Sequence, residues 1–269
     1  MRMRFLSVAA AVGLVACLAP AGAAQAAPAS YRVSIALSAT KADVGQTVTV
    51  SGRVTGPRAA RKALLVQHRV GTGAWRTVKK VRTTASARYS AAVRISTAGA
   101  QSLRVVAPRS SVRRAGTSAA RGLTGWRWID AARSGVSSNL QAGTVTVHGS
   151  RYSGLTVAPR GSGKLLVRFD GRCDAVSYSA GVGGEMNNWA LLDLMQGQGA
   201  ELAPALARIE PWVSGGNTPL TATWALRTES DHLEFGLFSS SQDHRAVLIS
   251  PRLHCTVNSL PKATLPTAG

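Results

Sequence analysis

Two tryptophans stand where their rings are able to contact a ligand. Trp189 follows the amide side chain of Asn188 after a glycine-rich approach, and Trp212 lies in a loop-like stretch that ends at Gly216. Flat amphipathic rings stack on sugar rings, and neighbouring amides bind sugar hydroxyl groups. We therefore predict Trp189, Trp212 and Asn188 as candidate sugar-binding residues. The alternative interpretation is that both rings pack in the core or at the rim of a β-sandwich.

The acidic and hydroxyl residues do not form a catalytic pattern. Glu234 lies close to Asp231, but the strand alternation around it points its side chain outward, which predicts a solvated face. The residue types of a Ser-His-Asp triad occur between Ser239 and His244, too close together on one loop for the relay geometry. The chain has no HExxH, P-loop, GxGxxG or EF-hand motif, and its five histidines are scattered singly. We predict no enzymatic activity, no metal site and no cofactor.

The N-terminus has the layout of an export signal. A basic MRMR start is followed by the apolar run FLSVAAAVGLVACLAP and a small-residue stretch, which predicts a signal peptide over residues 1–26 and a mature start near Ala27. The apolar run is too short for a stable membrane span. The alternative is that Leu14 to Cys17 form a lipobox and that Cys17 becomes a lipid anchor. Either way the protein is expected to be secreted or held at the cell surface.

The remaining two cysteines predict one disulfide. Removal of Cys17 leaves Cys173 and Cys255, an even number in an oxidising compartment. Their bond would close a loop of 255 − 173 = 82 residues, for which the chain-entropy model gives about 4–5 kcal/mol of stabilisation. Two separately buried thiols are the alternative.

The positive charge is concentrated in one half of the chain. Residues 31–121 contain eighteen Lys and Arg and one acid, Asp43, which gives +17, whereas residues 122–269 contain twelve basic and eleven acidic residues. Arginine-rich composition alone does not remove acids from one half only. A field of this size attracts polyanions. Between the halves, residues 108–121 are rich in Pro, Ser, Gly and Ala without periodicity, which predicts a linker.

Strict alternation predicts a small antiparallel sandwich over residues 31–107. Thr47–Val54 and Arg88–Ser96 alternate apolar and polar residues, and turn residues separate them from four further predicted strands. Those four strands are Tyr31–Leu37, Ala63–Val70, Trp75–Thr83 and Gln101–Ala107. The run VGQTVTVSG, the tryptophan strand and RYS together resemble bacterial immunoglobulin-like modules. Such modules indicate a fold and no particular ligand.

A second resemblance covers residues 122–256. Its matching residues are Gly149, Tyr152, Gly154, Leu155, Gly181, Val182, Asp243, His244 and Pro251 to Leu253. This set resembles the novel putative carbohydrate-binding module of bacterial glycoside hydrolases. The resemblance implies a galactose-binding-like jelly-roll sandwich in which Cys173 and Cys255 meet, and it adds Asp243 and His244 to the ligand-binding candidates. That fold class frequently holds a structural Ca²⁺, although no motif in this chain supports one.

These observations predict an all-β protein with an N-terminal immunoglobulin-like sandwich, a C-terminal jelly roll and a flexible tail at residues 257–269. The expected function is non-catalytic binding of a polysaccharide or an anionic cell-wall polymer by a monomer. No specific nucleic-acid partner is expected, because charge alone causes nucleic-acid binding in vitro. One alternative is a structural or adhesion protein that contacts other proteins and binds no sugar. Another is a hydrolase or inhibitor.

Overall fold

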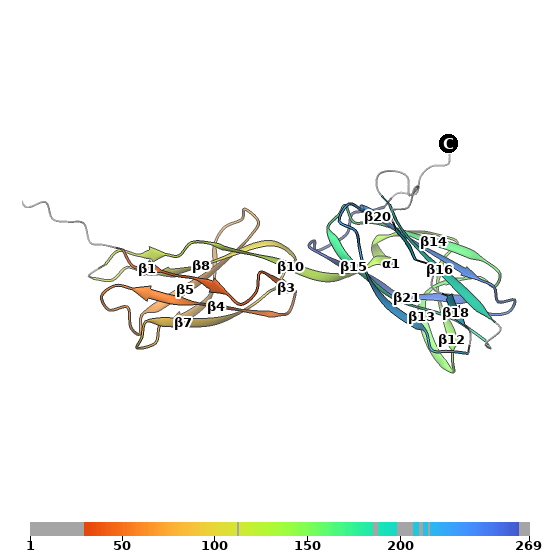
Figure 1. Ribbon diagram of the computed structural model, residues 1–269, viewed down its shortest axis with the longest axis horizontal. Coiled ribbons are helices and arrows are strands. Elements are labelled where there is room, and N and C mark those ends of the chain that lie inside the picture. Colours follow the sequence, from red (N-terminus) through yellow and green to blue (C-terminus); the bar gives the residue numbers. More distant parts are fainter. Residues whose placement is uncertain are drawn as a thin grey trace, which may run out of the picture.

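A computed structural model describes residues 30–111, 113–184, 188–197, 207–209, 212–214 and 216–263. The predicted signal peptide, Cys17 and residues 264–269 lie outside this described part. The described chain is almost entirely β-structure, with a single short helix, α1 (Ala131–Ser134). The prediction of an all-β protein is confirmed. Figure 1 shows two β-structures placed end to end, with β10 running from one into the other.

The first sandwich contains two sheets. Its strands are β1 (Arg32–Val33), β2 (Ala36–Leu37), β3 (Lys41–Asp43), β4 (Thr47–Thr55), β5 (Ala63–Val70), β6 (Arg76–Arg82), β7 (Arg88–Arg94), β8 (Gly99–Ala107), β9 (Gly116–Thr117) and the first half of β10 (Arg121–Asp130). In one sheet β4 pairs with β1, β2 and β7; in the other β8 pairs with β5, β9 and β10, while β6 forms the edge. The alternation in β4 and β7 buries their apolar residues between the sheets and leaves polar residues outside.

A tyrosine and a glycine fix the start of the first sandwich. The buried Tyr89 hydroxyl donates a hydrogen bond of 2.6 Å to the carbonyl oxygen of Ser34. Gly52 lies opposite Tyr89 in the β4–β7 ladder, and a Cβ atom there would stand 2.1 Å from the same oxygen. Only glycine therefore lets the N-terminal segment approach β4 this closely. Burial raises the pKa of Tyr89 to about 12.

The second sandwich also contains two sheets. Its strands are β11 (Val136–Ser138), β12 (Gln141–Val147), β13 (Ser150–Val157), β14 (Ser162–Arg168), β15 (Cys173–Val182), β16 (Trp189–Gly197), β17 (Ala207–Ile209), β18 (Trp212–Ser214), β19 (Leu220–Ala225), β20 (His232–Ser239) and β21 (Ala246–Cys255). One sheet has β13, β21, β15 and β19 as neighbours, and the other runs β11-β14-β20-β16 and ends on β17 and β18. Inward side chains of both sheets form one apolar core.

The predicted disulfide is confirmed. Cys173 opens β15 and Cys255 ends β21, and the two residues face each other in the ladder between these strands, with their Cα atoms 4.0 Å apart. Both are almost completely buried. The bond therefore clasps two neighbouring strands of one sheet at the end of the sandwich that faces β10.

The two sandwiches share one strand instead of a free linker. β10 pairs with β8 as far as Gly125 and then, from Arg127, with β21. Leu123 belongs to the core of the first sandwich, and within the predicted linker β9 pairs with β8. Residues 108–121 are therefore attached to the first sandwich. The amino-acid composition suggested a linker, because β9 has only two residues and is too short to show an alternating pattern.

The predicted flexible tail is packed where the structure describes it. Val257 lies against the second core, and Leu260 is buried in it. Asn258 reaches the first sandwich, because its Nδ2 donates to Thr97 Oγ1 at 2.8 Å and its Oδ1 accepts from the Ala98 amide at 3.1 Å. This segment contributes to the contact between the sandwiches.

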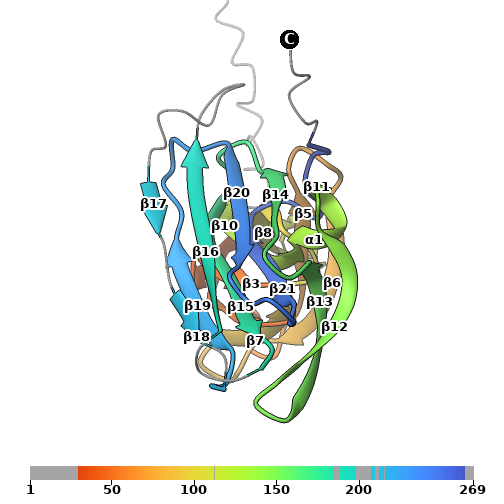
Figure 2. The same cartoon turned by 90° about the vertical axis from the view of Figure 1, so that its right-hand side faces the viewer.

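A histidine joins the sandwiches at the same place. His254 on β21 has Nε2 2.9 Å from Asp43 of the first sandwich and Nδ1 2.7 Å from Asp174 of the second. Its ring stacks on Trp126, with centroids 5.0 Å apart, and lies near Trp128. The view in Figure 2 looks onto the second sandwich with β3, β5 and β8 of the first behind it. The shared strand and these contacts hold the two parts together.

Candidate ligand-binding surfaces

Two of the predicted sugar-binding residues lie around a glycine pair after β15. Asn188 Nδ2 donates to the Gly183 carbonyl oxygen at 3.4 Å. A Cβ atom on Gly184 would stand 2.3 Å from that amide nitrogen and 3.1 Å from the Nδ1 atom of His244. The structure thus brings Asn188 and His244 together, with glycine leaving the space that their side chains use. Asp243 is exposed beside His244 on the preceding turn.

Trp189 lies on the outer face of the β11-β14-β20-β16 sheet. Its ring is 5.6 Å from that of Phe238, at 40°, and its backbone is tied to Ser240, whose hydroxyl donates to the Trp189 carbonyl at 2.8 Å. Phe238 is 38% exposed, so the aromatic pair is open to solvent on one side. The backbone of Trp212 pairs with Leu191 one strand further, and its side chain lies outside the described part.

The sequence analysis did not identify Phe238. The alternating pattern does place Phe238 on the outer face of β20, together with Glu234 and Gly236. On the neighbouring strand it stands opposite Leu191, two residues from Trp189. The alternating pattern does not show which strand lies beside β20. The register supplies that information and places an aromatic pair where a single ring was expected.

Glu234 corrects another expectation, because it is not on a solvated face. The residue is only 7% exposed, and Leu166 and Met195 stand opposite it on the two neighbouring strands. Lys164 Nζ lies 2.8 Å from Glu234 Oε1 as an ion pair without aligned hydrogen-bond geometry. The outer face of this sheet therefore combines aromatic rings with one paired carboxylate.

The hydroxyl groups near Asp243 and His244 serve the backbone. Ser241 Oγ accepts from the amides of Asp243 at 3.4 Å and His244 at 2.9 Å, and Ser239 Oγ donates to the His244 carbonyl. These contacts form a turn stabilised by a serine side chain. They position the two candidate residues at the end of β20.

The first sandwich presents a nearly uninterrupted cationic surface. None of its eighteen Lys and Arg side chains is buried, and they occur on both sheets and on the loops. The single acid, Asp43, is bound to His254 at the contact with the second sandwich. No ion pair among the described residues neutralises any of these cations. The sandwich therefore keeps its full positive charge at its surface.

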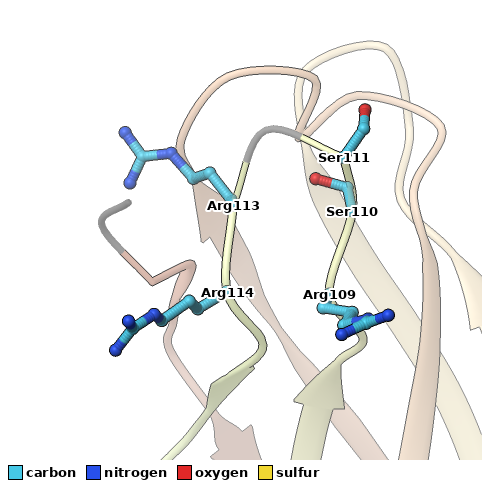
Figure 3. A pocket seen from close by; sticks show the side chains of 5 residues that line it. All are labelled: Arg109, Ser110, Ser111, Arg113 and Arg114. Atoms are coloured by element: carbon cyan, nitrogen blue, oxygen red, sulfur yellow. The ribbon is translucent and has the colours of Figure 1, made fainter. Parts of the chain in front are cut away.

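The tip of the first sandwich that lies away from β10 is especially basic. Arg109, Ser110, Ser111, Arg113 and Arg114 line an open hollow of about 540 Å³. In Figure 3, Arg113 and Arg114 extend to one side of the loop and Arg109 to the other. The guanidinium groups diverge, so they do not enclose a single small anion.

The pKa of Tyr31 responds to the positive potential at this tip. Its buried ring lies 4.2 Å beneath Lys62 Nζ, and its hydroxyl is 2.9 Å from Ser110 Oγ. The hydrogen bond with Ser110 and the charges of Lys62 and Arg113 lower the pKa of Tyr31. The cations of the tip therefore act on a neighbouring group as well as on solvent.

The described residues do not meet the requirements of a metal site or of a membrane-spanning helix. Among them, no three or more His, Cys, Asp and Glu side chains lie close enough together to hold a metal ion. None of the helices in these ranges has the length and apolar character needed to cross a bilayer. In comparisons with known proteins, no family model matches the chain and no curated protein matches it.

Proposed function

We propose that this protein is an extracellular, non-catalytic binding protein whose basic sandwich attaches it to an anionic polymer of the cell envelope. The observation that carries the proposal is the charge of that sandwich. It has eighteen cations, none buried, and one acid that is already bound to His254. Such a surface attracts polyanions over about 8 Å at physiological salt.

The distribution of the cations favours a polymer over a small anion. They occupy β4, β6 and β7 as well as the tip, and the arginines of the tip point in different directions. A chain with repeated negative groups is able to contact many of these cations at once, whereas one phosphate ion contacts few. Release of counterions from the polymer then drives binding, and the affinity falls as salt rises.

The second sandwich is proposed to supply selectivity for a glycan. Support comes from the resemblance to the carbohydrate-binding module and from the pairing of Trp189 with Phe238 on an outer sheet face. Asn188, directly before Trp189, lies together with His244, and their polar atoms suit sugar hydroxyl groups. The resemblances assign an immunoglobulin-like fold to the first sandwich and a galactose-binding-like jelly roll to the second.

The test uses the whole mature chain. A cut near residue 122 would divide β10 and remove Leu123 from the first core, so the two sandwiches are not compared as fragments. We expect purified cell-wall polymer to bind the chain at low salt, with the logarithm of the affinity falling linearly as the logarithm of the salt concentration rises. Binding to a neutral glycan should persist at high salt and be lost when Trp189 and Phe238 are both replaced by Ala.

The two parts of the proposal fail separately. A mature chain that does not bind anionic polymer at low salt contradicts the role of the basic sandwich. An array of neutral glycans without a signal that depends on Trp189 and Phe238 contradicts the role of the second sandwich. If both fail, a structural or adhesive role through protein contacts becomes the better explanation.

A further inference from the structure

One group of side chains on the first sandwich differs from its other cations. Two guanidinium groups lie on the same indole ring: the Cζ atom of Arg104 is 4.2 Å from the centroid of Trp75, and that of Arg69 is 4.7 Å away. Arg69 lies on β5, Arg104 on β8, and Trp75 immediately before β6. Within the described residues, no other aromatic ring is contacted by two cations.

Strand register explains how these residues meet. Gln67 stands opposite Arg104 in the β5–β8 ladder, and Arg69 follows two residues later on the same side of β5. Gln67 also stands opposite Thr77 of β6, so Trp75, two residues before Thr77, reaches the same outer face. Gln67 Oε1 accepts a 2.9 Å hydrogen bond from Arg104 Nε, which fixes the orientation of that side chain.

The two arginines are held in place but remain available to a ligand. Both are half-buried, whereas fourteen of the eighteen cations of this sandwich are exposed. Arg69 Nε is buried and makes no hydrogen bond in the described part of the chain. Apart from Arg104 Nε, no guanidinium nitrogen of this pair has a hydrogen bond or ion pair among the described residues.

We propose that Arg69, Trp75 and Arg104 form a subsite for one oxyanion group of the polymer. This inference rests on the proposed function, because it names the place on the basic sandwich where the polymer is recognised. A guanidinium stacked on an indole loses little further side-chain freedom on binding, and its terminal N–H groups match the two oxygens of a phosphate or carboxylate. Both Cζ atoms lie within 4.7 Å of one ring centroid, so the two guanidinium groups are presented from the same place on the sandwich.

The chemistry is shared by two kinds of repeat unit, a phosphodiester and a uronic acid carboxylate. Inorganic polyphosphate and polygalacturonate serve as the respective probes. The full mature chain is compared with a variant carrying Arg69→Lys and Arg104→Lys, which keeps the net charge but removes the planar donors. The matched control carries Arg53→Lys and Arg88→Lys, because these two arginines face each other on β4 and β7, are fully exposed and have no aromatic partner.

We expect the Arg69/Arg104 variant to bind at least one probe about tenfold more weakly, since charge-assisted bidentate hydrogen bonds are lost, while the control changes less than about twofold. Loss with polyphosphate alone identifies a phosphoryl group, loss with polygalacturonate alone a carboxylate, and loss with both an oxyanion of either kind. Equal affinities of the variant and the control would overturn the subsite. Wild-type protein that binds neither probe contradicts the proposed function instead.

A measurement on the unmodified protein covers the case in which the variant does not fold. The Nε–H signals of Arg69 and Arg104 in a ¹⁵N-labelled chain are followed by NMR during titration with polyphosphate and, separately, with polygalacturonate. Saturable shifts confined to these signals and to the Trp75 indole support the subsite. Uniform shifts of all arginine Nε–H signals would mean that the polymer is held by overall charge and that the subsite does not exist.

Discussion

The two sandwiches have similar strand content but are stabilised in different ways. The first has no cysteine and carries eighteen basic residues against one acid, whereas residues 122–269 carry twelve basic and eleven acidic residues and the disulfide. In the second sandwich the described ion pairs include Lys164–Glu234, Arg168–Asp170 and Arg227–Glu229. The first sandwich therefore accepts mutual repulsion of its surface charges, which its core and its backbone ladders must offset.

This difference in surface charge and covalent linkage suits the two β-sandwiches to different tasks. A surface of one charge sign suits attraction to a polymer and weakens the folded state through self-repulsion, which salt relieves. A surface of mixed charge with a covalent clasp suits the precise placement of side chains such as Trp189 and Phe238. The two sandwiches should consequently respond to different perturbations, and the following experiments measure this.

The largest expected effect concerns the disulfide. Replacing Cys173 and Cys255 by Ala removes the link across 82 residues and should lower the free energy of unfolding of the second sandwich by about 4–5 kcal/mol. Hydrogen exchange measured by mass spectrometry should accelerate in β14, β15 and β20 and much less in β4 and β7. Treatment of the wild type with a reductant is the control and should reproduce the pattern. Equal acceleration in both sandwiches would mean that they unfold as one unit.

The next effect is confined to the first sandwich. Gly52→Ala places a Cβ atom 2.1 Å from the Ser34 carbonyl oxygen and 2.7 Å from the Tyr89 hydroxyl, so the N-terminal segment must move. We expect a loss of about 1–3 kcal/mol in the free energy of unfolding, as for other overpacked sites. Gly122→Ala is the control, because its Cβ atom would have its nearest neighbour 3.9 Å away. Similar urea midpoints for the two variants would show that the close approach at Gly52 is unimportant.

Sequence patterns predicted the individual strands better than their neighbours. β5 has the predicted bounds, and the alternation of β4 and β7 identified their buried residues, because burial on one face of a strand leaves a local signal. The cysteine pair was also predictable from parity. The continuation of β10 into both sandwiches was not, because alternation does not reveal which strand pairs with which, and composition therefore suggested a linker.

The candidate sites show the same limit. Trp189 was predicted from its residue type, but its partner Phe238 is set by strand register. The neighbours of Glu234, Leu166 and Met195, are likewise brought from other strands by pairing. Stacking of Arg69 and Arg104 on one ring likewise requires β5, β6 and β8 to be neighbours.

A smaller effect is expected where the sandwiches meet. Asp43→Asn removes the carboxylate that His254 Nε2 contacts at 2.9 Å and leaves the Asp174 contact in place. The loss should be about 1 kcal/mol, as for a partly exposed charged hydrogen bond, and should appear as faster exchange in β3. Asp170→Asn breaks an ion pair with Arg168 inside the second sandwich and should leave β3 unchanged. Unchanged exchange in β3 of the Asp43 variant would show that the Asp43–His254 contact does not help to hold the two parts together.

The smallest expected effect is a change in stability at alkaline pH that comes from the titration of tyrosines. This titration does not affect stability at neutral pH. Burial raises the pKa of Tyr89 to about 12 and also raises that of Tyr178 in the second core. A raised pKa means that the folded state keeps its proton after the unfolded chain has lost it, near pH 10. Tyr89 therefore contributes stability that is complete below pH 10 and is lost between pH 10 and about 12. Tyr89→Phe also loses the hydrogen bond to the Ser34 carbonyl oxygen at every pH. The quantity to compare is therefore the slope of stability against pH between pH 10 and about 12, which should be smaller in the variant because phenylalanine cannot ionise.

The pKa of Tyr31 is shifted in the opposite direction, downward. This distinguishes the tyrosine at the basic tip from Tyr89 and Tyr178. The Ser110 hydrogen bond and the nearby charges of Lys62 and Arg113 lower its pKa, so the folded state loses this proton before the unfolded chain does. Its contribution therefore grows as the pH rises from the lowered pKa towards 10. Ultraviolet difference spectra should show one tyrosine ionising before the others, and Tyr31→Phe should remove that step. Because salt screens exposed charges but leaves the Ser110 hydrogen bond in place, the early step should move only part of the way towards pH 10 at high salt, while the Tyr89 midpoint stays near pH 12. An early step that survives in the Tyr31→Phe chain would show that the charge of the tip does not reach its own tyrosine.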